Sequence, residues 1–351
     1  MRPAARDERG FALLAVLLVM ALLGVVGAEF AYSMRLEASA VRAWKDGIVA
    51  AHLAEAGIAQ AIREIAAESS FVGLGEDGVL TFYARDLRPL PRLPRDRVPL
   101  GGGEFSYRIT DEEARLNVNT ATPDRLDRLL QFLGLDKSAR DVIVDSIQDW
   151  RDPNEEHRLN GAESDDHYLK LPEPYRARNG NIESLVELLQ IRGVTRALYH
   201  GRAGAGGGDA EGGSENGDKE EAGRATGERQ RAPGGPRSAS ERRPGLADVL
   251  TAKTPGQVNL NTASEAVLRA YALGDAEISQ IFQARRAMPY PQVPGQFGGR
   301  GFITTTRTFR IEADGLVDGQ VRARITAIVQ RRTDGGPGGA AVAILDWSGP
   351  R

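Results

Sequence analysis

The sequence predicts an α+β fold in which a long N-terminal helix, first transmembrane and then amphipathic, packs on an antiparallel sheet. Residues 11–28 form an uncharged apolar run, which predicts the start of the helix. Alternating apolar residues near 105–109 and 321–329 predict the sheet. The long segment between these strands contains an internal repeat, so we expect it to form a large, mostly α-helical insertion domain.

The apolar run from Phe11 to Ala28 is close to the roughly 20 residues that a helix needs to cross a bilayer. We assign 11–30 to the transmembrane part of the helix. The preceding residues, 1–10, read as a leader that contains three arginines, and positive charge favours the cytoplasmic side of a membrane. We therefore expect a single-pass protein whose C-terminal bulk lies on the far side.

A small residue, Gly10, stands immediately before Phe11 at the start of the apolar run. This arrangement resembles a type III signal, which prepilin peptidase cuts between Gly and Phe. A secretory signal peptide has a shorter apolar run followed by a small-residue cleavage site, and no clean site of that kind follows here. The run by itself leaves open a second interpretation, which is an ordinary uncleaved anchor.

The helix is expected to continue beyond the membrane to about Ala67. Apolar residues recur at three- and four-residue steps between Ile48 and Ile65, and charged residues occupy other positions, as on an amphipathic helix. The sequence contains no proline between Arg6 and Arg88 that would break such a helix. One helix therefore connects the membrane to the folded part of the chain.

The sheet domain is predicted to form from two separate parts of the chain. Residues 31–110 make its first part, and residues 307–333 contribute its last strands. Asp318–Gly319 gives a hairpin signal between two alternating runs. We assign 334–351 to a C-terminal tail. The strands expected from alternation cover 79–84, 105–109, 309–313 and 321–329.

The insertion domain, residues 111–306, contains the repeat. Arg115–Ala121 reads RLNVNTA, and Gln257–Ala263 reads QVNLNTA. Each copy precedes a predicted helix. Residues 201–245 are rich in Gly, Ser, Glu and Arg and poor in apolar residues, so we predict a disordered loop there. The expected helices of the insertion cover 123–133, 181–189 and 264–273.

The repeat resembles helix-hairpin-helix motifs, which often bind the DNA backbone through a Gly-rich turn. This resemblance gives the alternative function, a membrane-anchored DNA-binding protein of the competence type. The turns at Gly134 and Gly274 depart from the motif, because each carries an aspartate, Asp136 or Asp275, where a phosphate would bind. The net charge of −3 offers no basic excess either, so no nucleic acid is expected.

No catalytic constellation stands out in the sequence. It contains no phosphate-binding Walker loop, no G-x-S-x-G and no H-E-x-x-H motif. It also contains no cysteine, which excludes disulfides and thiol catalysis. We therefore expect a non-enzymatic protein.

An acidic stretch inside the insertion is the candidate metal site. Oxygen ligands this dense suit Ca²⁺, which takes six to eight oxygens. The stretch does not match an EF-hand loop, and a solvated acidic loop with helix caps is an equally good interpretation of its composition. The candidate calcium ligands are Asp149, Asp152, Asn154, Glu163, Asp165 and Asp166.

Taken together, these segments resemble the K-type minor pseudopilin family of type II secretion over nearly the whole chain. The resemblance implies a pseudopilin α+β domain with a large helical insertion and bound calcium. The motifs that carry it are Gly10–Phe11 with the apolar run, Asp111–Ala121 (DEEARLNVNTA), Asp149–Asp152 (DWRD), Asn160–Glu163 (NGAE) before Tyr168, and Asn259–Thr262 (NLNT).

The resemblance also implies a processing route, a location and partners. Prepilin peptidase would remove residues 1–10, and Phe11 would become N-methylated. The protein would sit in the inner membrane with its bulk in the periplasm. The implied partners are the I-type and J-type minor pseudopilins, the major pseudopilin and the inner-membrane secretion platform.

One position inside the apolar run indicates a place in the fibre. Most pilins carry a glutamate five residues into the mature helix, and here that position is Ala15. A charge inside the bilayer costs about 2.5–3.5 kcal/mol on insertion scales unless it is paired. A subunit that starts a fibre meets no earlier neighbour, so it can lack this glutamate, as the K-type family does. Ala15 therefore marks a tip position.

Overall fold

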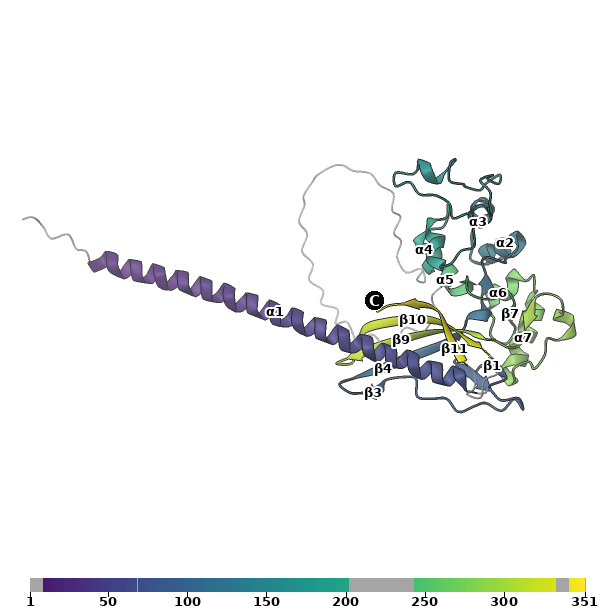
Figure 1. Ribbon diagram of the computed structural model, residues 1–351, viewed down its shortest axis with the longest axis horizontal. Coiled ribbons are helices and arrows are strands. Elements are labelled where there is room, and N and C mark those ends of the chain that lie inside the picture. Colours follow the sequence, from purple (N-terminus) through teal and green to yellow (C-terminus); the bar gives the residue numbers. More distant parts are fainter. Residues whose placement is uncertain (1–8, 68, 202–242, 333–340, 351) are drawn as a thin grey trace, which may run out of the picture.

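The computed structural model describes residues 9–67, 69–201, 243–332 and 341–350, and its longest element is α1, Arg9–Ala66 (Figure 1). The N-terminal part of this 58-residue helix extends away from the folded body. Its apolar N-terminal part is exposed on all sides, and it has the length and hydropathy of a membrane span. The predicted single continuous helix is confirmed, and one N-terminal anchor is consistent with it.

The C-terminal part of α1 packs on a five-stranded sheet whose strand order is β11-β10-β9-β4-β3. Every neighbouring pair in this sheet is antiparallel. The hairpin between β9 and β10 turns at Asp318 and Gly319, which both have positive φ, as the sequence predicted. The strands are β3 (Val98–Leu100), β4 (Gly103–Asp111), β9 (Thr308–Val317), β10 (Gln320–Arg332) and β11 (Ala341–Ser348).

Small residues let α1 approach the sheet closely. A Cβ atom added to Gly315 of β9 would lie 1.8 Å from the carbonyl oxygen of Ala50 in the helix. One added to Gly57 would lie 3.1 Å from the Cβ of Ala313. Around these contacts lies one core, formed mainly by buried residues of α1, β4, β9 and β10, together with Val72, Leu80 and Phe82. Close backbone approach therefore fixes the register of the helix on the sheet.

Two details of the sheet domain differ from the sequence prediction. Residues Ala341–Ser348, which we assigned to a tail, form β11 and pair with β10. The run AVAILDWS lacks strict alternation, so only its pairing with β10 reveals it as a strand. The predicted strand near residue 80 is β2 (Leu80–Tyr83), and it pairs with β1 (Phe71–Leu74) in a separate hairpin.

The insertion forms a second core between the end of β4 and the start of β9. It combines helices with two pairs of short parallel strands, β5–β6 and β7–β8. The disorder predicted for 201–245 falls mainly on residues 202–242, which lie outside the described residues. The elements are η1 (Glu112–Ala114), β5 (Leu116–Asn117), α2 (Pro123–Phe132), α3 (Lys137–Arg151), η2 (Tyr168–Lys170), η3 (Leu185–Gln190), α4 (Arg196–His200), α5 (Leu246–Val249), β6 (Leu250–Thr251), β7 (Val258–Asn259), α6 (Glu265–Ala270), α7 (Asp275–Ala287), η5 (Gly295–Phe297) and β8 (Phe302–Ile303).

Candidate functional site

The sequence repeat folds into two modules that use the same contacts. In the first module, Asn119 clamps Ile182 by accepting from its backbone N–H and donating to its carbonyl, at 2.8 and 2.9 Å. In the second module, Asn261 clamps Tyr290 in the same way, at 2.7 and 3.1 Å. In each module, the side-chain oxygen of the asparagine two residues earlier accepts from the backbone N–H of the clamping asparagine and so holds the turn. The repeat is therefore a structural duplication.

An arginine near the end of a later helix in each module reaches back to the turn. Arg151 of α3 donates to the carbonyls of Val118 and Ala121. Arg285 of α7 donates to the carbonyls of Leu260 and Ala263, the corresponding positions. Burial lowers the pKa of Arg285 to about 10. These guanidinium groups satisfy buried carbonyls, so they hold the modules together and are not exposed for binding.

Carboxylates cap the helices that follow the two Gly-containing turns. Asp136 accepts from the backbone N–H of Ala139 at the start of α3, at 2.9 Å. Glu277 of α7 accepts from the backbone N–H of Gly274, also at 2.9 Å. A DNA phosphate would need these same amide groups. Negative side chains of the chain itself hold them instead, which gives phosphate binding no electrostatic support.

Three consecutive buried acids, Asp111, Glu112 and Glu113, join the sheet to the insertion. Asp111 at the end of β4 accepts from Asn259 and Thr262 of the second module and from Thr306, at 2.5 to 2.8 Å. Burial raises the pKa of Asp111 to about 6, against the lowering effect of these hydrogen bonds. Asp111 therefore links the two cores directly.

The other two acids of this joint bind the start of β9. Glu112 forms an ion pair with Arg310 at 2.8 Å and another with Arg115. Glu113 accepts from the backbone N–H groups of Arg307 and Thr308, at 3.1 and 3.0 Å. With these contacts the chain enters and leaves the insertion at one fixed point. The insertion is therefore positioned relative to the sheet by buried charge.

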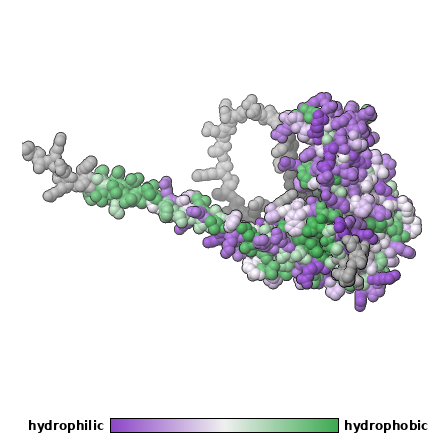
Figure 2. Space-filling view, in the orientation of Figure 1, coloured by the Kyte–Doolittle hydropathy of each residue, from purple (hydrophilic) through white to green (hydrophobic). Residues whose placement is uncertain are grey.

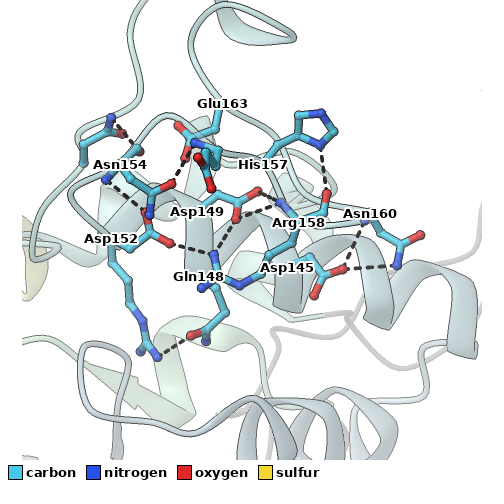
Figure 3. Close-up of polar contacts among 12 residues, drawn as sticks. Asp145, Gln148, Asp149, Asp152, Asn154, His157, Arg158, Asn160 and Glu163 are labelled. Atoms are coloured by element: carbon cyan, nitrogen blue, oxygen red, sulfur yellow. Dashed lines mark hydrogen bonds and ion pairs between the residues drawn. The ribbon is translucent and has the colours of Figure 1, made fainter.

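The acidic stretch gathers around Arg158, in the loop that follows α3 (Figure 3). Arg158 Nη1 lies 2.6 Å from Asp149 Oδ1 and 2.7 Å from Asp152 Oδ2. The backbone N–H of Arg158 also donates to Asp149 Oδ2, at 3.1 Å. Gly161 approaches so closely that an added Cβ would lie 1.8 Å from Asp149 Oδ2. Asp149 is therefore fully buried in a tight backbone cradle.

Glu163 is buried beside this cluster, and neither of its carboxylate oxygens has a hydrogen-bond partner. Its pKa is raised to about 7, first by burial and then by the negative charges of Asp149, Glu155 and Asp152. A buried carboxylate without partners costs several kcal/mol in ionised form, on the order of the penalty for an unpaired buried charge. A positive charge placed beside Glu163 would offset this penalty.

The remaining predicted ligands do not all join this cluster. Asn154 accepts from the backbone N–H of Glu156 and donates to Asp152, so it caps the loop. Asp166 accepts from the backbone N–H of Glu163 at 2.7 Å. Asp165 is exposed. The structure therefore places Asp149, Asp152 and Glu163 together and gives the other three positions local roles or none.

Two residues that we did not predict lie in the same cluster. Glu155 accepts from Asn179 at 3.0 Å, and the side-chain oxygen of Asn179 is buried without a hydrogen-bond partner. Glu155 belongs to the acidic stretch and was within reach of sequence reasoning. Asn179 lies 24 residues further along the chain, and no sequence signal connects it to the cluster.

The donor set fits a hard cation, because it consists of carboxylate and amide oxygens. Within the described ranges, however, no three His, Asp or Glu side chains are already arranged around one point as a metal centre. The guanidinium of Arg158 lies between Asp149 and Asp152 and is hydrogen-bonded to both. The Arg158 side chain is 41% exposed, so it can swing outward and leave the oxygens to a cation.

The predicted processing residues lie at the start of α1. Gly10 and Phe11 have helical backbone, and Ala15 lies one turn further along the exposed part of the helix. The leader residues 1–8 are outside the described part of the chain. The geometry neither requires nor opposes cleavage, so these assignments remain predictions.

A family model described as type II secretion system protein K matches residues 108–201, which contain the joint, the first module and the acidic cluster. The type II secretion system protein K of Pectobacterium carotovorum is 28% identical over 217 residues, covering 55% of this chain and 60% of that protein. Over these matched residues the chain is similar to the type II secretion system protein K family. This confirms the resemblance that the sequence motifs indicated.

Further relatives agree. A putative type II secretion system protein K of Escherichia coli K12 is 27% identical over 206 residues, and that of Aeromonas hydrophila is 26% identical over 216 residues. The matches span about 60% of the length of these curated relatives. The family is one of structural, non-enzymatic proteins, in agreement with the sequence prediction.

A solved structure also resembles the chain. It is the GspK–GspI–GspJ complex of the type II secretion system of enterotoxigenic Escherichia coli, with a TM-score of 0.48 and 14% sequence identity. The match covers 73% of this chain and 83% of the solved chain.

Proposed function

We propose that this chain is the minor pseudopilin at the tip of a type II secretion pseudopilus, where it nucleates or caps assembly and aids the export of folded proteins across the outer membrane. The observation that carries the proposal is the absence of a carboxylate at position 15 of an otherwise complete assembly helix. A subunit without this carboxylate cannot form a charge pair with an earlier neighbour in the membrane.

The shape of the molecule supports a terminal position. The insertion and the sheet lie together at the end of α1 that is furthest from the apolar run (Figure 1). The joint of buried acids fixes the insertion there. A body of this size beyond the helix would obstruct a further subunit above it, whereas the exposed part of α1 remains open to subunits below.

The proposal includes processing, location and partners. Prepilin peptidase cuts between Gly10 and Phe11, Phe11 is N-methylated, and the chain sits in the inner membrane with its bulk in the periplasm. Its partners are the I-type and J-type minor pseudopilins, the major pseudopilin and the inner-membrane platform. GspI and GspJ, which form the solved complex with GspK, are proteins of the I and J types.

Two measurements test this function. Mass spectrometry of the membrane-extracted protein is expected to show a mature chain that starts at methylated Phe11, and an intact leader would remove the processing claim. A Gly10→Ala variant should accumulate uncut. A C-terminal tag labelled with gold should mark one end of each pseudopilus, and labels along the whole fibre would contradict a tip position.

For the acidic cluster, we propose a structural calcium ion held by Glu163, Asp149 and Asp152, with Glu155 and Asn179 alongside. The support is the buried Glu163 carboxylate without partners and the unpaired oxygen of Asn179. Calcium would supply the positive charge that these oxygens lack and would order the loop from 152 to 166. Isothermal titration of the chelator-treated full chain with CaCl₂ should show binding, and a flat titration would refute it.

The two modules fit a helix-hairpin-helix interpretation in which the hairpins serve packing. The alternative DNA-binding function finds no favourable observation, because Asp136 and Glu277 hold the helix-start amides. A salt-dependent mobility shift of duplex DNA by the chain would revive it.

A further inference from the structure

The two edges of the main sheet differ sharply in how they are protected. At one edge, β3 has three residues, Val98–Leu100, and its middle residue is Pro99. A short strand with a proline is a common way to prevent another chain from pairing with a sheet edge. At the other edge, β11 has eight residues without proline, lysine or arginine. The β3 edge is therefore short and contains a proline, whereas β11 is long and is interrupted by one register shift, opposite Ile328 and Val329.

The composition of β11 adds to this asymmetry. Six of its eight residues in AVAILDWS are apolar, and Asp346 is its only charged residue. Ile344 is 52% exposed and Trp347 is 42% exposed. Within the described part of the chain, β11 pairs with β10 on one side only. The strand therefore presents both unpaired backbone groups and large apolar side chains.

The exposed side chains lie on the face of the sheet that α1 covers. Ile344 is opposite Val329 and Trp347 is opposite Ala327 in β10, and both β10 residues are buried in the core under α1. Val342 packs on the edge of that core. Figure 2 shows hydrophobic surface where β10 and β11 lie in Figure 1. The apolar strip is thus a continuation of the core beyond the reach of the helix.

The opposite face of β11 borders a cleft. Asp346 and Ser348 line it together with Thr326 of β10 and with Val186 of η3 in the insertion, and its volume is about 220 Å³. Val186 is itself exposed. A strand added to β11 could therefore contact the apolar strip with the side chains on one of its faces and the cleft with those on the other.

We propose that the β11 edge is a docking site for an extended edge strand of a different subunit that is anchored in the same membrane. This inference rests on the proposed function, which supplies such neighbours. An extended strand is the one occupant that satisfies a row of unpaired backbone N–H and C=O groups, and alternate side chains supply the specificity.

A second copy of this chain does not fit the edge. Two identical edges that pair symmetrically run antiparallel. Antiparallel pairing of β11 with its own copy would turn the two α1 helices in opposite directions, and their apolar ends could not enter one membrane from the same side. The partner must therefore present a different strand.

The test uses matched lysine substitutions at the two edges. Ile344→Lys places a charge on the β11 edge, and Leu100→Lys places one on the β3 edge at a residue of nearly equal exposure, 49%. The full-length chain is co-produced with full-length I-type and J-type minor pseudopilins, extracted in detergent, and its dissociation constants are measured. Ile344→Lys should weaken binding of one partner at least about tenfold, and Leu100→Lys less than about twofold.

Hydrogen exchange gives a backbone readout that side-chain contact alone would not produce. Amide groups of residues 341–348 should gain protection in the wild-type complex, and those of 98–100 should not. Unchanged binding by Ile344→Lys, equal losses in both variants, or no added protection in β11 would overturn the inference and leave the proposed function standing. If the wild type binds neither minor pseudopilin, the proposed function fails and the docking site fails with it.

Discussion

Glu163→Gln should be more stable than the wild type without calcium, and the added calcium should reverse that order. The wild-type carboxylate is buried without partners, and its pKa is raised from 4.5 to about 7. A carboxyl whose folded pKa is raised stabilises the fold below its unfolded pKa and loses that contribution as pH rises through the folded pKa. Without calcium, the ionised Glu163 therefore costs roughly 3 kcal/mol at pH 7.5.

The glutamine variant removes this charge and keeps the shape of the side chain. In chelator at pH 7.5 we expect Glu163→Gln to unfold at a temperature about 5 °C or more above wild type. With calcium at about 1,000 times its dissociation constant, the wild type should gain about 4.1 kcal/mol, whereas the variant should gain little. Wild type then becomes the equal or the more stable of the two.

The assay is thermal unfolding of the detergent-solubilised full chain, followed by circular dichroism, between pH 4.5 and 7.5. In chelator, wild-type stability should fall across this window, and calcium should remove the part of that fall that comes from Glu163. Asp165→Asn is the matched control, because Asp165 is an exposed acid of the same stretch and should change neither condition. A Glu163→Gln protein that is destabilised in chelator and still responds to calcium would refute the reasoning.

Three further outcomes follow from the packing and the joint. Gly315→Ala should lower the free energy of unfolding, measured by chemical denaturation, by at least about 2 kcal/mol, because its Cβ would overlap the Ala50 carbonyl. Gly102→Ala, with open space around it, should leave this free energy nearly unchanged. Asn261→Ala should cost about 2–3 kcal/mol by leaving the backbone groups of its clamp unpaired, and a loss under 1 kcal/mol would argue against the clamp. With calcium present, wild-type stability should fall by about 3 kcal/mol as pH rises from 4 through 6, because the Asp111 pKa is raised to about 6, and Asp111→Asn should flatten this slope.

The acidic cluster shows where sequence reasoning stops. Composition indicated oxygen ligands between 149 and 166, and Asp149, Asp152 and Glu163 do lie together. Composition could not separate these from Asp165 and Asp166, since a loop can point any of its side chains to solvent. Asn179 was invisible to it, because its approach depends on how a later loop folds back.

The sequence by itself determined the elements whose signals are local. The apolar run and the three- and four-residue spacing specified α1, alternation and Asp318–Gly319 specified the β9–β10 hairpin, and the repeated N-x-N-T-A specified two similar modules. Only the tertiary structure decided the rest. It paired β11 with β10, joined the two cores through Asp111, and gave β11 no second partner strand among the described residues. These outcomes depend on contacts between residues far apart in the chain, which periodicity within a short window cannot encode.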